Sequence, residues 1–236
     1  MDRKADYAYQ IIRSKIITGE YPPMTDLSEE ALQKELGFSR TPVREAILRL
    51  RDNGFIIVFP KKGTIVSPVS HDLIEEIYEV RLVNEPYICQ RASKTMPRSI
   101  LESIREKLLT KPEIHGEPGI RLYYISLDDQ LHRKILQYCG NSFLVRTMSL
   151  VYAHNDRFRY FSSNPVNDNS IAEHTDLIDA MLSQDMDLIE EKARSHILAS
   201  KQITLKTFSQ SKIAGDFQTL NDFDSNELPL TQFKIV

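Results

Sequence analysis

Apolar residues at the beginning of the chain recur at helical spacing. Between residues 6 and 18 they lie about one turn apart on one helix face, at Tyr7, Ile11, Ile12 and Ile16. Gly19 and the paired prolines of GEYPP then interrupt the pattern. The sequence therefore predicts a first helix over residues 6–18.

A second, shorter helix has clear signals at both ends. Ser28 is a residue type that caps helices, and Glu29 and Glu30 place negative charge in the first turn, where it stabilises the helix dipole. Gly37 follows the last apolar residue and is typical of a helix end. A helix is therefore expected up to residue 36.

A third helix is predicted from about Thr41 to Asp52. Thr41 can cap it, and Pro42 suits the first helical position because its missing N–H is not needed there. Asn53-Gly54 ends it. The apolar face of this helix consists of Val43, Ile47 and Leu50.

The period then changes from helical to alternating. FIIVFP and TIVSPVS are two short β-rich runs separated by the turn KKG, which predicts a hairpin. Three helices followed by a two-stranded wing are the element order of a winged helix-turn-helix.

The rest of the chain is expected to be an antiparallel bundle of about six helices. Gly is scarce there, and helical stretches are expected at 71–95, 98–110, 117–139, 141–162, 169–183 and 185–208, with breaks near Met96-Pro97, Lys111-Pro112, Gly140 and Asn164-Pro165. The predicted fold is mostly α. Its domains are residues 1–70, residues 71–208, and a tail at 209–236 without a sustained period.

Composition changes this picture little. Hydrophobic residues make up 41% and charged residues 27%, as in ordinary globular proteins, and no apolar stretch is long enough to cross a membrane. The N-terminus lacks an apolar leader core, and two lone cysteines, Cys89 and Cys139, fit a reducing compartment. A cytoplasmic protein without a membrane partner is expected.

The net charge of −3 argues against nucleic-acid binding, but the charge is uneven. Residues 1–69 hold 11 Lys+Arg and 9 Asp+Glu, so they are net positive, whereas the remainder is net negative. The positions of the basic residues therefore matter more than their number.

Basic side chains gather where a winged domain meets DNA. An Arg at the start of a recognition helix can donate two hydrogen bonds to a guanine edge in the major groove, and Gly in a wing tip permits close approach to the duplex. The alternative is that these residues only solvate a helix face. The candidates are Arg40 just before the third helix, Thr41, Arg44 and Arg49 within it, and Lys61, Lys62 and Gly63 in the wing.

SRTPVREAILRL followed by NGFIIVFPKKGTIVSPVS resembles the winged-helix motif of the GntR family of bacterial regulators. The resemblance implies DNA contacts by Arg40, Thr41, Arg44 and Gly63, with Lys62 near the minor groove. This sequence departs at Glu30, where the family usually carries Arg. An acid cannot pair with a phosphate, so the preferred operator is expected to differ from those of relatives.

Four residues of the helical region are candidate metal ligands. Asp128 and His132 lie four apart on one helix face, and His174 and His196 follow on later helices. A carboxylate and three imidazoles inside a bundle could bind a divalent metal and leave coordination positions open. The alternatives are core histidines and a simple intrahelical Asp128–His132 pair.

DDQLH, CGNSFL, EHTDLIDAMLSQD and ARSHI are similar to the all-helical FCD effector domain of the FadR branch of that family. The resemblance implies a divalent metal (Zn, Ni or Mn) on Asp128, His132, His174 and His196, with a small carboxylate effector in the open positions. Asp129 is the weaker carboxylate candidate because it falls outside the family's slot.

Arg81 and Glu85 match the family's R-x3-E on the first helix of this domain. A guanidinium suits bidentate binding of an effector carboxylate, so Arg81 is predicted to contact the effector. The alternative is an internal salt bridge with Glu85. Asn155 is a further candidate for the effector site.

These features predict a metabolite-responsive transcription regulator, in particular a repressor. It would bind a double-stranded operator as a homodimer, pairing through the helical domains. The alternative is a metal-dependent enzyme acting on a small organic acid. The enzyme is disfavoured because no nucleophile elbow, P-loop, Rossmann glycine pattern or proton shuttle is evident in the sequence.

Overall fold

The structure, a computed structural model, describes residues 3–60, 62–110, 112–113, 116–161 and 168–210. It divides into two compact units. The first comprises residues up to Leu73 together with the last described turn of the final helix from Leu205, and the second comprises Ile74–Thr204. Lys61 and most of the predicted tail, residues 211–236, lie outside the described residues.

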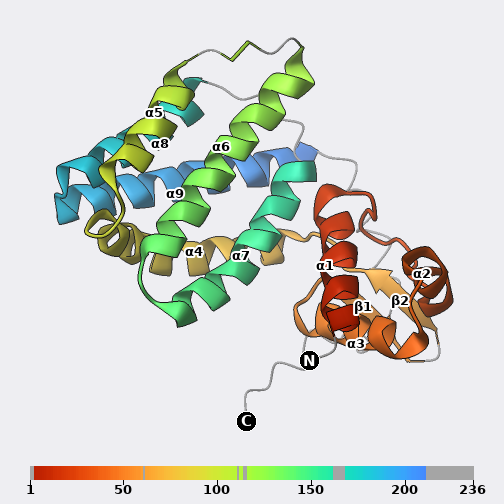
Figure 1. The fold of residues 1–236 in the computed structure, drawn as a ribbon. Helices are drawn as coiled ribbons and strands as arrows, with labels where there is room; N and C mark the ends of the chain where they lie inside the picture. Colours follow the sequence, from red (N-terminus) through yellow and green to blue (C-terminus); the bar gives the residue numbers. More distant parts are fainter. Residues whose placement is uncertain (1–2, 61, 111, 114–115, 162–167, 211–236) are drawn as a thin grey trace. The chain divides into compact units, whose positions relative to one another are not determined.

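The first unit has the predicted order of three helices and a hairpin (Figure 1). Its two strands are antiparallel, with Ile57 opposite Ile65 and Phe59 opposite Gly63. This order confirms the winged helix-turn-helix. The elements are α1 (Arg3–Thr18), α2 (Glu29–Leu36), α3 (Arg40–Asp52), β1 (Ile56–Phe59) and β2 (Gly63–Val66).

The ends of α2 follow the sequence signals. The Ser28 hydroxyl accepts a hydrogen bond from the Ala31 N–H at 3.3 Å, which satisfies one of the N–H groups that a helix start leaves unpaired. Gly37 has φ of 67°, and its N–H donates to the Gln33 carbonyl. A left-handed residue is needed there, which is why glycine stands at this position.

Two details of the predicted helices were wrong. Ser39, not Thr41, is the N-cap of α3, so Thr41 and Pro42 lie inside the first turn. In α1, Tyr7 is 61% exposed, and the buried face instead consists of Ala5, Ala8, Tyr9, Ile12 and Ile16. Ala5 and Ala8 belong to this face because their small side chains let α1 approach α3 closely. The prediction followed only the larger apolar residues and therefore did not include these alanines.

The connection between α1 and α2 braces the hairpin. Asp26 forms a bridge with Ile65, the Leu27 N–H donates to the Thr64 carbonyl at 2.7 Å, and the Val66 N–H donates to the Thr25 carbonyl at 2.9 Å. These bonds pair the outer edge of β2 with the chain before α2. The wing is therefore fixed to the same scaffold that positions α3.

The second unit consists of helices in the described residues, as predicted (Figure 1). α5 packs against α6 and α8, and Arg105 of α5 forms a two-bond salt bridge with Asp179 of α8. The helices are α4 (His71–Ser93), α5 (Arg98–Leu109), α6 (Glu117–Tyr138), α7 (Ser142–Phe161), α8 (Asp168–Ser183) and α9 (Met186–Gln210).

α4 contains a proline that the neighbouring helix compensates. Pro86 has no N–H, so the Leu82 carbonyl one turn earlier loses its usual helical partner. Arg194 of α9 donates to that carbonyl at 3.3 Å. Tyr78 of α4 also hydrogen-bonds Ser200 and Thr204 of α9, both at 2.8 Å, so the two helices are joined along their length.

None of the helices in the described ranges combines the length and the apolar character that a membrane crossing requires.

Replacing Leu50 tests the packing of α3. Leu50 is completely buried, so Leu50→Ala should destabilise the first unit by about 2–5 kcal/mol through lost burial and a residual cavity. Leu48 on the same helix is 39% exposed, and Leu48→Ala should change stability by no more than about 0.5 kcal/mol. Urea unfolding of the full chain, followed by circular dichroism, measures both. Equal effects would contradict this assignment of the buried face.

Candidate functional site

The start of α3 presents cationic and polar side chains to solvent. Arg40, Thr41 and Arg44 are exposed, and the Arg40 side chain is 72% accessible with one contact, at 3.3 Å, to Glu29. Val43, Ile47 and Leu50 lie on the opposite, buried face. The helix thus offers to solvent the end that a recognition helix inserts into the major groove.

Arg49 differs from the other candidate arginines. Its Nη1 donates to Asp6 of α1 at 2.6 Å, and its guanidinium lies 4.5 Å from the centroid of the Tyr9 ring. The side chain is 28% exposed. Arg49 therefore joins α3 to α1 within the folded unit, and its contact with DNA stays a prediction.

The wing tip exposes Lys62 and Gly63. Gly63 has φ of 137°, a conformation that other residues adopt only with strain, although an added Cβ would meet no atom within 4 Å. The backbone conformation thus gives a reason for glycine here that is separate from access for a ligand.

Inside the second unit, the four predicted metal ligands lie together. Asp128 and His132 come from α6, His174 from α8 and His196 from α9, and one ligand atom from each lies within 4.8 Å of all the others. The three histidines are buried. The structure therefore joins residues that are up to 68 positions apart in the chain.

Two of the three short separations between these atoms match those expected around one metal ion, and the third, from His174 to Asp128, is shorter. His174 Nε2 is 2.5 Å and His132 Nε2 is 3.2 Å from Asp128 Oδ1, and the Nε2 atoms of His132 and His196 are 3.2 Å apart. Ligands about 2.1 Å from one metal, at angles of about 90–110°, lie about 3.0–3.4 Å from each other. One carboxylate with three imidazoles is also a donor set that divalent transition metals favour, so the residues fit the group.

Each imidazole turns its second nitrogen toward an oxygen. His174 Nδ1 is 2.6 Å from the Ser170 carbonyl, His132 Nδ1 is 3.8 Å from Glu85 Oε2, and His196 Nδ1 is 3.8 Å from Glu173 Oε2. An acceptor at hydrogen-bond distance from Nδ1 holds the proton there and leaves the Nε2 lone pair for a metal, and His174 has such an acceptor. At His132 and His196 the carboxylate oxygens lie beyond hydrogen-bond distance, and His196 Nδ1 is buried without a hydrogen-bond partner among the described residues.

The charges favour a carboxylate ligand at Asp128. Burial alone would raise the pKa of Asp128, but the charges of Arg159 and His174 hold it well below its usual range, so this group is ionised. An Arg159 nitrogen contacts the second carboxylate oxygen. Asp129 points elsewhere and forms a salt bridge with Arg133 at 2.7 Å, in line with its weaker candidacy.

Burial dominates at His196. It lowers the pKa of this imidazole well below its usual value, and the neighbouring His174 and His132 act in the same direction. His196 is therefore neutral near pH 7, which is the form that binds a metal.

Arg81 lies fully buried beside the cluster and is already paired. Its Nε and Nη2 donate to the two Glu85 oxygens at 2.5 and 3.3 Å, and its Nη1 donates to Asn155 at 2.9 Å. Burial alone would lower the pKa of Arg81, but the Glu85 charge raises it overall. The internal salt bridge expected as the alternative is present, and effector contact by Arg81 or Asn155 stays a prediction.

Three contributors to the site were missing from the sequence prediction. Arg159 lies on α7 without any motif, and its contact with Asp128 follows from tertiary packing alone. Glu173 directly precedes His174, so the acid-histidine pair was a usable signal for it. Ser170 acts through its backbone carbonyl, which the residue type does not reveal.

Comparison with protein families gives two matches. Residues 4–66 match the gntR family of bacterial regulatory proteins, and residues 76–199 match the FCD domain. The two matched segments correspond to the winged unit and to the helical unit with its histidine cluster.

Similar proteins and structures agree with these matches. The chain is 28% identical over 191 residues to the transcriptional repressor RspR of Escherichia coli K12, covering 80% of this chain and 83% of the relative. It is 33% identical over 135 residues to a helix-turn-helix regulator of Agrobacterium vitis, covering 55% and 77%. The solved E. coli McbR/YncC structure has a TM-score of 0.71 at 18% identity, covering 88% of this chain and all of that one.

Removing one imidazole tests the cluster as a metal centre. His174→Ala should lower bound divalent metal from about one ion per chain to well under half, because one ligand of the set is lost. His71→Ala is the matched control, since His71 has a side chain 63% exposed and lies outside the cluster. Elemental analysis of protein loaded with Zn²⁺ and then dialysed gives the stoichiometry. Full occupancy in His174→Ala would remove this residue from the ligand set.

Proposed function

Since this chain belongs to the gntR family of bacterial regulatory proteins and carries an FCD domain, we propose that it is a metabolite-responsive repressor. Its helical unit binds a divalent metal and a small carboxylate, and this binding changes the affinity of the winged unit for operator DNA. The observation that supports the proposal most is the convergence of Asp128, His132, His174 and His196 in a chain that also has an exposed recognition helix.

In the proposed DNA complex, α3 enters the major groove with its N-terminal end first. Arg44 reads a base edge, while Arg40 and Thr41 contact bases or phosphates at the groove margin. Lys62 and Gly63 bring the wing against the backbone or minor groove. Contact of Arg49 with DNA stays a prediction, because Asp6 and Tyr9 already hold its guanidinium.

Asp128, His132, His174 and His196 would hold the metal, for which Zn, Ni and Mn are the candidates. When bound, the metal supplies a Lewis-acidic anchor for one carboxylate oxygen of the effector. The Ser170 carbonyl orients the His174 imidazole for this task, while Glu85 and Glu173 place negative charge 3.8 Å from the Nδ1 atoms of His132 and His196.

Arg81 is proposed to contact the effector by exchanging partners. An effector carboxylate would replace Glu85 or Asn155 on the guanidinium, because a buried arginine requires an anionic or polar partner at all times. Glu85 lies between Arg81 and His132, so the exchange would alter both the hydrogen bonds of Arg81 and the surroundings of the His132 imidazole, a proposed metal ligand. α4 carries Arg81 and Glu85, and it is the element that would respond.

The regulator would act in the cytoplasm as a homodimer on a pseudo-palindromic operator, where two α3 helices meet two half-sites. A coupling free energy of about 1–3 kcal/mol between effector and DNA would change operator affinity roughly 5–150-fold. RspR is named as a repressor, which supports the same sign of regulation here. The relatives named as regulators also favour this function over a metal-dependent enzyme.

Arg44→Ala tests the recognition helix. Loss of a base contact should weaken specific binding by about 1–3 kcal/mol, roughly 5–150-fold in Kd. Arg51→Ala is the control, because Arg51 is a cation of the same helix at the opposite end. A preferred duplex is first selected from random sequences with the unaltered protein, and fluorescence anisotropy then gives Kd. Indistinguishable affinities for Arg44→Ala and the unaltered chain would place Arg44 outside the interface.

A thermal-shift screen of small mono- and dicarboxylic acids tests the effector. An acid that binds the folded state raises the Tm by mass action. At an acid concentration of one hundred times its Kd, binding adds about 2.7 kcal/mol to the free energy of unfolding. The rise should require metal and should disappear after chelation or in His174→Ala, while His71→Ala should retain it. An acid that raises the Tm equally in all four preparations would contradict binding at the histidine cluster.

A further inference from the structure

α7 supplies none of the four candidate metal ligands, yet one face of it lies against the site. Residues three or four positions apart share a helix face, and three polar residues of α7 have this spacing. The ring of the first contacts the His132 ring, with centroids 6.0 Å apart, the second accepts a hydrogen bond from Arg81, and the third contacts Asp128. We call these residues the inner stripe; they are Tyr152, Asn155 and Arg159.

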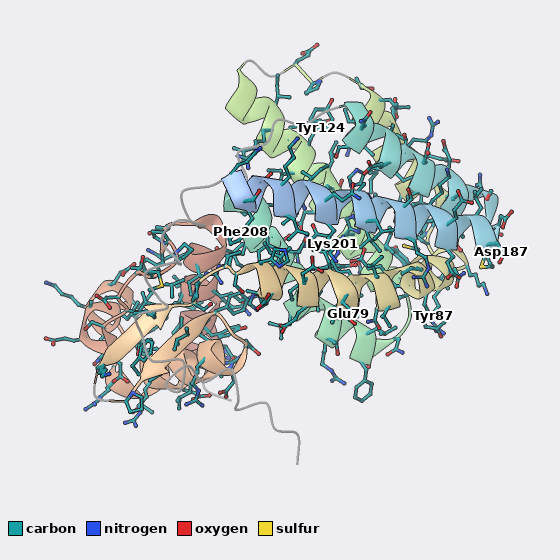
Figure 2. All side chains as sticks on the ribbon, turned by 180° about the vertical axis from the view of Figure 1, so that it is seen from behind. Glu79, Tyr87, Tyr124, Asp187, Lys201 and Phe208 are labelled. Carbon is teal, nitrogen blue, oxygen red and sulfur yellow. The ribbon has the colours of Figure 1, made fainter. Side chains whose placement is uncertain are left out.

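The inner stripe forms one wall of the site. α6 and α7 make one layer of the second unit, which lies in front in Figure 1. α4 and α9 make the other layer, which lies in front in Figure 2, where Glu79 marks α4 and Lys201 marks α9. Because Arg81 comes from α4 and His196 from α9, a molecule bound at the cluster would have the inner stripe of α7 on its other side.

The Tyr152 hydroxyl is buried and makes no hydrogen bond with any residue that the structure describes. Tyr78 of α4 shows the usual arrangement, because its hydroxyl is also buried and lies 2.8 Å from the hydroxyls of both Ser200 and Thr204. Folded proteins rarely leave a buried hydroxyl unpaired, since the unmade hydrogen bond is unfavourable. A molecule that binds at the cluster can supply the partner that Tyr152 lacks.

Neighbouring charges place the Tyr152 hydroxyl beside the Arg81–Glu85 pair. Burial, and after it the Glu85 charge, raise the pKa of Tyr152 well above its usual value, and the Arg81 charge acts in the opposite direction. The phenol therefore keeps its proton near pH 7. In this form the hydroxyl can donate a hydrogen bond to an oxygen atom of a bound molecule.

Asn155 adds a second donor one helical turn further along α7. Its Oδ1 accepts from Arg81 Nη1 at 2.9 Å, so its Nδ2 carries the amide protons, and no residue in the described ranges accepts from this nitrogen. Asn155 is only 7% exposed. Two buried donors of the inner stripe thus lie next to each other beside the guanidinium of Arg81.

We infer that Tyr152 determines the specificity of the effector site, and that its hydroxyl donates a hydrogen bond to a hydroxyl group that the effector carries beside its metal-bound carboxylate. The effector would accordingly be a 2-hydroxy acid. The inference rests on the proposed function, in which the metal and Arg81 take the two carboxylate oxygens. Tyr152 and Asn155 are then left for a further oxygen, and the contact of Tyr152 with His132 places this oxygen near the metal.

A hydroxyl group suits this position better than an apolar one. It can accept from the Tyr152 hydroxyl and from Asn155 Nδ2, and it can donate its own proton to a Glu85 oxygen. A methylene in its place would leave both donors unpaired in a buried site, which is unfavourable. The site should therefore discriminate between acids that differ by one hydroxyl.

Matched acids test this discrimination. The full chain loaded with Zn²⁺ is titrated with lactate and propionate, and with malate and succinate, in a calorimeter. Each hydroxy acid should bind at least about 3-fold more tightly than its partner. In Tyr152→Phe this preference should fall by about 3–10-fold, the contribution of one hydrogen bond, while the affinities for propionate and succinate and the bound zinc stay unchanged.

Tyr160→Phe is the matched control for this experiment. Tyr160 lies on the same helix but is 40% exposed and outside the inner stripe, so its hydroxyl should not affect the preference. His174→Ala, with its metal ligand removed, should abolish the metal-dependent binding of all four acids.

The stability of the unliganded chain tests separately whether the Tyr152 hydroxyl is unpaired. Tyr152→Phe removes no hydrogen bond within the described residues, so the Tm should stay unchanged or rise. Tyr78→Phe breaks the bonds to Ser200 and Thr204 and should lower the Tm. Differential scanning calorimetry without added acid gives both values.

The inference is overturned if the unaltered chain does not prefer the hydroxy acids, or if Tyr152→Phe retains the full preference. A loss of Tm in Tyr152→Phe as large as that in Tyr78→Phe also overturns it, because the hydroxyl would then have a structural partner. Metal-dependent binding of propionate or succinate would uphold the proposed function in each of these cases. If none of the four acids binds in a metal-dependent way, the proposed function fails as well.

Discussion

Four electron-rich atoms, one carboxylate oxygen and three imidazole nitrogens, meet at one point inside the helical unit. Atoms of this kind repel each other at such short range unless a proton or a metal ion lies between them, so their convergence is a constraint that the surrounding packing must maintain. The fold maintains it from outside, through the Ser170 carbonyl at His174 Nδ1 and through Arg159 at Asp128. The arrangement of α4, α6, α7, α8 and α9 is therefore inseparable from the chemistry of the site.

The sequence predicted the elements well because periodicity and end signals are local. Ser28 and Gly37 define α2 through bonds within one turn, and the helices of the second unit follow from periodic runs, most of which are separated by Pro or Gly. The start of α3 was misplaced because Ser39 and Thr41 are both good caps, and the choice between them depends on the preceding turn. Arg159 was beyond prediction because only tertiary packing brings α7 to Asp128.

The arginines of α3 illustrate a second limit of sequence patterns. Arg40, Arg44 and Arg49 look equivalent as cations of one basic helix. In the folded unit, Arg49 pairs with Asp6 and packs on Tyr9, whereas Arg40 and Arg44 extend into solvent. The difference comes from the contact with Asp6 of α1, 43 residues away in the chain, and it separates an arginine that joins two helices from two that stay exposed.

Pro86 gives α4 a property that its other turns lack. Between Arg81 and Arg91 the helix is held at one point by a side chain of α9, at the Leu82 carbonyl, instead of by its own backbone. A helix that lacks one backbone hydrogen bond bends more easily at that turn than elsewhere. A displacement of the Arg81–Glu85 pair would then change the angle between the two halves of α4. A small change of this angle would move the end of the helix by a larger distance.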